Sequence, residues 1–156
     1  MRSALLLISQ FAVLATLLVA HAAPTPKDPR TPAKIDLDRL DGTWRVTSIQ
    51  VAGAETHANG QELLITFKNG EFAWGNGGGN AGKITAIDPS RNPKEITYTF
   101  HDGPDKGKVL KGIYKFDGDT FTDCFGRAGG ERPAKFSSTQ ENGYYLMTYE
   151  RVKKTH

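Results

Sequence analysis

Beyond residue 40, apolar and polar side chains alternate with a period of two in several short runs. The clearest is residues 95–100, where Ile96, Tyr98 and Phe100 alternate with polar neighbours. Such alternation is typical of a strand with one face in a core and the other in water. The pair Asn69-Gly70 follows a second run of this kind, and such a dipeptide is a strong signal for a two-residue hairpin.

Glycine-rich and proline-rich turns separate these runs, and the spacing leaves no room for crossover helices. The expected strands are 43–51, 61–68, 71–74, 83–87, 95–100, 110–116, 120–125, 133–137 and 144–152. The pattern predicts an all-β fold, an antiparallel up-and-down β-barrel of about eight strands, because closure leaves no edge exposed. An open sandwich is the alternative.

The first residues have the pattern of a secretory signal. Arg2 precedes an apolar stretch at residues 4–20, which ends in Ala20-His21-Ala22, an A-x-A-like cleavage site. The alternative is a membrane anchor, but a run of about 17 residues is short for a span of roughly 20. We therefore expect residues 1–22 to be removed and the mature protein to be secreted or periplasmic, with no membrane span.

Two further segments follow the predicted signal. Residues 23–36 contain four prolines among charged and small side chains, which predicts an extended, disordered spacer. Residues 37–153 are then a single β-barrel domain of about 120 residues, enough for one hydrophobic core.

Charge and cysteine content narrow the function classes. The formal net charge of +3 is mild, and Lys and Arg are scattered among Asp and Glu, which argues against a nucleic-acid partner. Cys124 is the single cysteine, so no intramolecular disulfide can form. We expect its thiol to be a small buried hydrophobe, the alternative being a reactive or intermolecularly bridged thiol.

Several sequence blocks resemble a known family. They are LDGTW (40–44), DPSRNPKEI (88–96), GIYKFDGDTFTDC (112–124), ERPAKF (131–136) and YERV (149–152). Together they are similar to the lipocalin-like domain of unknown function that is abundant in planctomycete bacteria. The resemblance implies a lipocalin-like barrel but no activity, because fold does not give function. Asp123 departs from the pattern, since the family more usually carries an apolar residue before the cysteine.

The element Gly42-Thr43-Trp44 is also similar to the Gly-x-Trp signature of the first lipocalin strand. This resemblance implies that Trp44 closes one end of the barrel beneath an arginine, either Arg151 or Arg132. A guanidinium over an indole stabilises a fold by about 0.5 to 2 kcal/mol and performs no chemistry.

Catalytic, metal and phosphate signatures are weak. No Gly-x-Ser-x-Gly elbow occurs, and a pairing of Cys124 with a histidine has no linear signature. Acidic residues in the turns have no calcium-loop spacing. Residues 75–82 contain five glycines but no Gly-Lys-Ser/Thr ending, so they predict a long hairpin connection. We expect a non-enzymatic protein with no cofactor and no metal.

The barrel interior is the candidate site. Its residues are Phe72, Trp74, Tyr98, Phe100, Tyr114, Phe116, Phe121 and Asp123. An eight-stranded barrel either is filled by its own side chains or holds one small ligand. Alternation places Asp123 on the face of Phe121, where it needs a partner such as Tyr98, Tyr114 or an arginine, unless a bulge turns it to solvent.

Two functions remain open from the sequence. The first is an exported binding module that takes a small apolar or amphipathic ligand at the open end of the barrel, with Trp74 at the mouth. The alternative is a structural or protein-interaction domain with a filled core, which would act through loops such as 75–82 and 127–132. The sequence predicts no oligomeric state.

Overall fold

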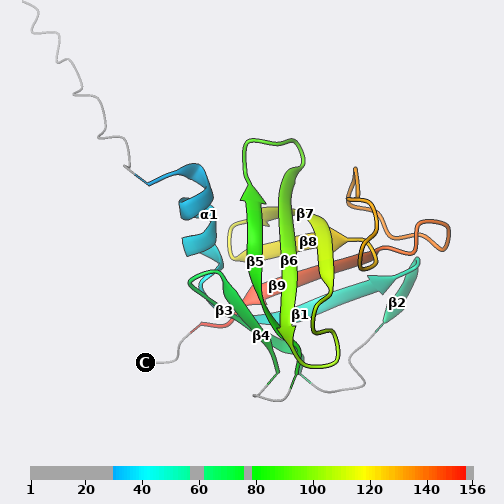
Figure 1. The fold of residues 1–156 in the computed structure, drawn as a ribbon, viewed down its shortest axis with the longest axis horizontal. Coiled ribbons are helices and arrows are strands. Elements are labelled where there is room, and N and C mark those ends of the chain that lie inside the picture. The colour runs from blue at the N-terminus through cyan, green and yellow to red at the C-terminus, as the bar shows by residue number, and fades with distance from the viewer. Residues whose placement is uncertain (1–29, 57–61, 76–78, 154–156) are drawn as a thin grey trace, which may run out of the picture.

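The computed structural model describes residues 30–56, 62–75 and 79–153, and the predicted signal lies outside this part. The described residues form one helix and nine strands. They are α1 (Pro32–Leu40), β1 (Gly42–Val51), β2 (Ala54–Thr56), β3 (Leu64–Lys68), β4 (Glu71–Trp74), β5 (Ala81–Asp88), β6 (Lys94–Asp102), β7 (Val109–Asp117), β8 (Thr120–Phe125) and β9 (Tyr145–Arg151) (Figure 1). Among these elements, no helix has the length and apolarity needed to cross a membrane.

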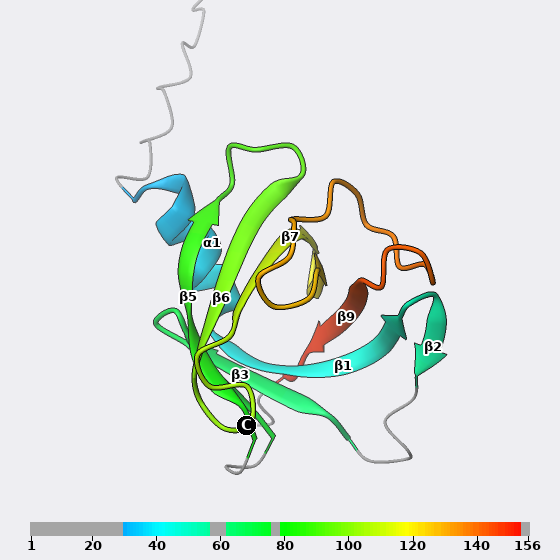
Figure 2. The same ribbon diagram turned by 45° about the vertical axis from the view of Figure 1, so that its right-hand side comes forward.

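The strands form a closed antiparallel barrel. From β3 to β9 each strand pairs with the next, β3 pairs with the start of β1, and β1 pairs with β9 to complete the ring. Figure 2 shows β1 and β9 side by side, with β2 beyond the end of β1. On its other edge β1 pairs with β3 through residues 42–45 and with β2 through residues 49–51, and its pairing with β9 has an irregularity between Val46 and Ser48. The predicted all-β barrel is confirmed.

The tight turns follow the local sequence. Asn69 and Gly70 both have positive φ, 52° and 80°, as a two-residue hairpin between β3 and β4 requires. Gly118, also at positive φ, turns β7 into β8. Several predicted boundaries differ, and β2 was not expected. Residues 133–137 form no strand, and the glycine-rich connection ends before β5, which already contains Gly82.

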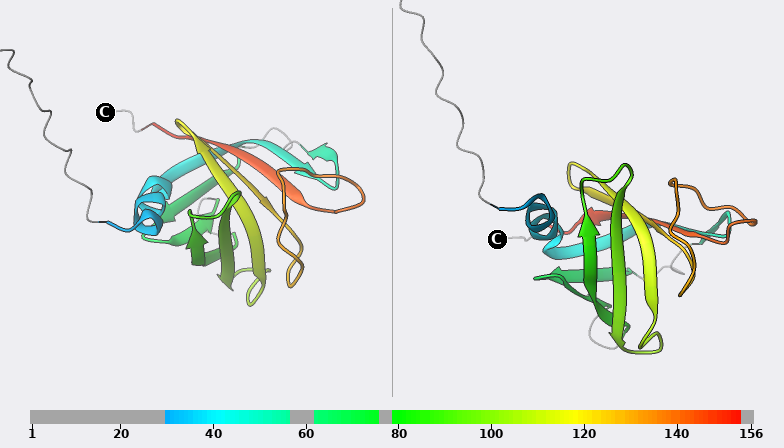
Figure 3. Two further views of the ribbon diagram at one scale, coloured as in Figure 1. Left: turned by 90° about the horizontal axis from the view of Figure 1, so that it is seen from above. Right: turned by 45° about the horizontal axis from the view of Figure 1, so that its top comes forward.

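Helix α1 was not expected, and it overlaps the last residues of the spacer predicted at 23–36. Thr31 caps the helix, its hydroxyl accepting a hydrogen bond from the Lys34 amide at 3.2 Å, and Pro32 occupies the first turn. Both residues are sequence signals for the start of a helix. The number of prolines in this segment led instead to the prediction of a disordered spacer. The helix lies at one end of the barrel, opposite β2, in both views of Figure 3.

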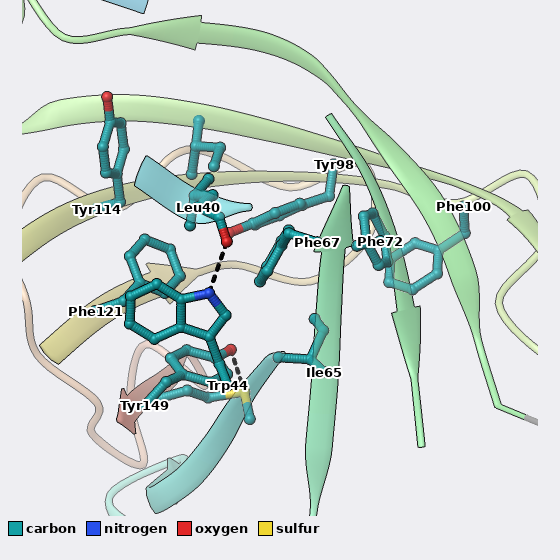
Figure 4. Packing of buried hydrophobic residues seen from close by; sticks show 12 residues of the cluster. Leu40, Trp44, Ile65, Phe67, Phe72, Tyr98, Phe100, Tyr114, Phe121 and Tyr149 are labelled. Atoms are coloured by element: carbon teal, nitrogen blue, oxygen red, sulfur yellow. Dashed lines mark hydrogen bonds between the residues drawn. The ribbon is translucent and has the colours of Figure 1, made fainter. Parts of the chain in front are cut away.

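Trp44 fills this closed end of the barrel. Its side chain is 0 % exposed, and its indole nitrogen donates to the Leu40 carbonyl at 2.7 Å, which ties β1 to the end of α1 (Figure 4). The Phe121 ring lies 5.9 Å away and the Phe116 ring 6.4 Å away. A large aromatic surrounded by rings and with its N–H satisfied is a strong local source of stability.

The arginine above Trp44 is Arg151. Its guanidinium carbon lies 4.2 Å from the indole centroid, and the same group donates to the carbonyls of Asp41 and Arg39. Gly42 makes room for it, since a Cβ there would lie 2.8 Å from Nη1 of Arg151. The Gly-x-Trp pattern therefore has a physical reason in this chain.

Arg132, the other candidate, lies elsewhere. Its guanidinium donates to the carbonyls of Ile96 and Gly112 and pairs with Glu95 at 3.2 Å. It therefore clamps β6 to β7 from outside the barrel and does not contact Trp44. Only the fold decides which of the two arginines reaches the indole.

Replacing Trp44 with alanine should lower the free energy of unfolding by about 3 to 5 kcal/mol, because a fully buried aromatic is lost and its cavity cannot be refilled. Urea or guanidinium melts measure this difference. The matched control is Trp74→Ala, which removes a half-buried indole at the opposite end and should be less destabilising. Equal losses for the two variants would contradict a special role of Trp44.

Candidate functional site

A pocket of about 470 Å³ opens at the end of the barrel away from α1. This volume lies within the range of small-molecule sites, about 300–1,000 Å³. The lining residues come from the ends of strands and from the loops that follow them. They are Ile49, Val51, Trp74, Asn80, Phe100, Asp105, Lys108, Leu110, Phe125, Gly126, Arg127, Ala128, Tyr145 and Met147.

The walls of this pocket are largely apolar. Val51 ends β1, Trp74 ends β4, and Leu110 lies near the start of β7, so three strands present apolar side chains at one level. At the rim the Phe125 and Tyr145 rings are stacked, with centroids 5.2 Å apart and planes 6° apart. An apolar wall with exposed aromatic surface is the usual lining of a site for a small apolar body.

Below the pocket the barrel is nearly full. Only about 20 Å³ remains between the pocket and the closed-end core, which is room for a single water molecule. The Phe72 ring occupies this level, 5.1 Å from the Phe100 ring and 5.5 Å from the Tyr98 ring, both in edge-to-face geometry. These aromatic pairs form the floor of the pocket.

The sequence-predicted interior residues therefore divide into three levels. Trp74 and Phe100 line the open-end pocket, and Phe72, Tyr98 and Asp123 lie beneath it. The remaining three, Tyr114, Phe116 and Phe121, pack around Trp44 at the closed end. Those three belong to the core, since alternation identifies which face is inward but not the depth at which a residue lies.

Asp123 is the one carboxylate at the centre of the barrel. It is 2 % exposed, and it accepts hydrogen bonds from the hydroxyls of Tyr98 at 2.8 Å and Tyr149 at 3.2 Å, one on each carboxylate oxygen. Of the alternatives that the sequence left open, the interior placement is the observed one. Tyr98 was an expected partner, whereas Tyr149 was not, because its depth relative to Asp123 depends on the pairing of β8 with β9.

Burial governs the titration of this cluster. Loss of hydration raises the pKa of Asp123 to about 7, even though the two tyrosine hydrogen bonds favour the charged form. Burial and then the neighbouring carboxylate raise the pKa of Tyr98 and of Tyr149 well above the ordinary tyrosine value. Both hydroxyls therefore remain donors, and Asp123 exchanges a proton near neutral pH.

A second buried carboxylate, Asp36, joins α1 to the barrel. It accepts from the Tyr114 hydroxyl and from the Lys94 ammonium, each at 2.7 Å. Burial, followed by this hydrogen bond, raises the pKa of Tyr114 above its ordinary value. The contact fixes the helix over the closed end and lies far from the pocket, so we assign it to stability.

Polar groups gather only at the pocket rim. The side-chain amide of Asn80 and the Lys108 ammonium both donate to the Asp105 carboxylate. The backbone amide of Asp105 in turn donates to Oδ1 of Asn80 at 2.9 Å. Arg127 lies on the loop after β8 and is exposed. These four residues were not among the predicted site residues, because nothing in a turn sequence indicates that it faces a pocket.

The described residues offer no group for metal binding, as no three His, Cys, Asp or Glu side chains lie close enough to hold an ion. Cys124 is buried on the outer side of β8, and its thiol faces the Ser137 carbonyl at 3.8 Å. Burial raises its pKa, which leaves it a weak nucleophile. His101 is exposed and pairs with Glu71.

No protein-family model matches this chain, and no curated protein matches it either. The similarity to the planctomycete lipocalin-like domain therefore remains a prediction from the sequence blocks. The fold is shown by the structure itself, a closed barrel with a plugged end and an open end.

The carboxyl of Asp123 should make stability depend on pH. Its folded pKa of about 7 exceeds the ordinary value of 3.8, so the folded state holds the proton more tightly. The contribution of Asp123 to the stability of the folded state is therefore greatest below pH 4. This contribution falls as the pH rises to 7. The loss is on the order of 4 kcal/mol in total.

Asp123→Asn lacks this proton and isolates the effect. We expect the free energy of unfolding of the variant, minus that of the unmodified protein, to grow between pH 4 and pH 7 and to level off above pH 7. Denaturant melts at several pH values measure it. A difference that is constant with pH would show that the carboxyl has an ordinary pKa.

Proposed function

We propose that this protein is a non-enzymatic binding module that takes one small apolar or amphipathic molecule in the open end of its barrel. The observation that carries the proposal is the pocket of about 470 Å³ directly above a tightly packed interior. A barrel built only for stability gains from filling such a space, since burial of apolar surface contributes roughly 25 cal/mol per Å².

The position of Trp74 supports this proposal. It lines the pocket, it is half-buried, and its ring lies 6.3 Å from the Tyr149 ring that holds Asp123. A ligand seated on this indole would exclude water from it and change its fluorescence. Trp44, the other tryptophan, lies in the closed end and would report little of the event.

The predicted secretory signal fits an exported carrier or scavenger. Export remains a proposal, because residues 1–22 lie outside the described part. Sequencing of the N-terminus of the protein recovered from its native host tests it, and a mature chain that begins at Ala23 or Pro24 is the expected result.

A binding screen tests the proposed function. A ligand present at a hundred times its dissociation constant should stabilise the native state by about 2.7 kcal/mol. For a domain of this size the melting temperature should rise on the order of 10 °C. Fatty acids, quinones, terpenoids and haem are suitable probes, and native mass spectrometry of protein from its host reveals a co-purifying molecule.

A matched pair of variants separates pocket binding from adhesion to the surface. Val51→Phe places a larger side chain in the pocket and should abolish the shift. Val109→Phe adds the same ring on the outer face, where Val109 is 37 % exposed, and should leave the shift unchanged. If both variants respond alike, or if no compound shifts the melt, an interaction domain with loop-borne function replaces the binding module.

A further inference from the structure

Arg127 is held in place at the pocket mouth by its backbone. The loop that carries it is tied to β7 by hydrogen bonds from the Gly126 amide to the Lys111 carbonyl and from the Gly129 amide to the Val109 carbonyl. The Arg127 carbonyl itself accepts from the Gly130 amide at 2.9 Å. The side chain therefore projects from a fixed position at the rim.

The guanidinium of Arg127 has no partner among the residues that the structure describes. Every other arginine in that part of the chain has a carboxylate, a carbonyl or an aromatic ring, as Arg45 does with Glu62 and Arg39 with the Phe116 ring. The guanidinium instead lies against Gly143, where a Cβ would come 3.3 Å from its Nη2 atom. The chain thus leaves space for this group without giving it a counter-charge.

The other charges of the rim cancel. Lys108 is paired with Asp105, and that carboxylate also accepts from Asn80. Among the described lining residues, the rim therefore carries one uncompensated positive charge, on Arg127. An apolar pocket with a single cation at its mouth is complementary to an apolar molecule with a single negative charge.

We infer that the ligand is an amphipathic monoanion whose apolar body fills the pocket and whose carboxylate binds Arg127. This inference rests on the proposed function and specifies its ligand class. The planar guanidinium donates two parallel hydrogen bonds to a carboxylate. Its hydrogen bonds to a neutral headgroup are weaker. The apolar walls contribute most of the affinity, and Arg127 gives the pocket its preference for a carboxylate headgroup.

Three probes with the same chain and different heads test the inference: dodecanoate, dodecanol and dodecylamine, each below the concentration at which it aggregates. Dodecanoate should bind the purified protein more tightly than dodecanol, on the order of ten- to a hundredfold, because a hydrogen bond to a charged partner is the stronger kind. Dodecylamine should bind most weakly. Trp74 fluorescence and calorimetry are the readouts.

Arg127→Gln should reduce dodecanoate affinity to that of dodecanol and leave dodecanol binding unchanged. The control Lys68→Gln removes one exposed positive charge at the end of β3, outside the pocket lining, and should leave both affinities as they were. Arg127→Lys retains the charge without the planar guanidinium and should lie between. Melting curves of each variant verify the fold.

The outcomes separate this inference from the proposed function. Equal affinity for dodecanoate and dodecanol overturns the anionic ligand but leaves the binding pocket intact. If Arg127→Gln still prefers dodecanoate over dodecanol, another group binds the carboxylate. That result also overturns the inference. Absence of binding by all three probes, together with failure of the wider screen, overturns the proposed function itself.

Discussion

The pairing of β1 with β9 is the constraint on which the rest of the structure depends. It joins the first and last long strands, closes the ring of hydrogen bonds and creates an interior with two ends. Residues from opposite ends of the domain meet there, so that Trp44 lies opposite Arg151 and Val51 opposite Tyr145. The pairing of these two strands therefore builds both the closed end and the mouth of the pocket, with the irregularity between Val46 and Ser48 lying between the two ends.

The two ends of the barrel differ in how they are filled. At the closed end, α1 supplies Leu40 and Asp36, and the aromatic rings around Trp44 leave no space. At the open end no helix of the described residues covers the barrel, and apolar side chains line a pocket in place of a core. The stability of the closed end, where aromatic burial is greatest, is what allows the other end to remain unfilled.

Asp123 connects these two halves. It lies below the pocket floor, and both of its oxygens are bonded to tyrosines from β6 and β9. Burying a carboxyl here reduces stability near neutral pH relative to an apolar residue, since a buried charge is costly even when hydrogen-bonded. The Tyr149 ring also contacts the Trp74 ring, with centroids 6.3 Å apart, so the cluster lies next to the wall of the pocket.

The sequence alone determined the fold class, the main hairpins and the inward faces of the strands, because period-two alternation and Asn-Gly or Asp-Gly turns act over a few neighbouring residues. It also indicated that Asp123 faces inward. It did not determine the depth of each residue along the barrel, which separated Phe100 in the pocket from Phe121 in the core. Nor did it identify Arg151 over Trp44, the role of α1, or Arg127 at the mouth. Those features depend on which strands become neighbours and in what register, and only tertiary closure of the sheet decides that.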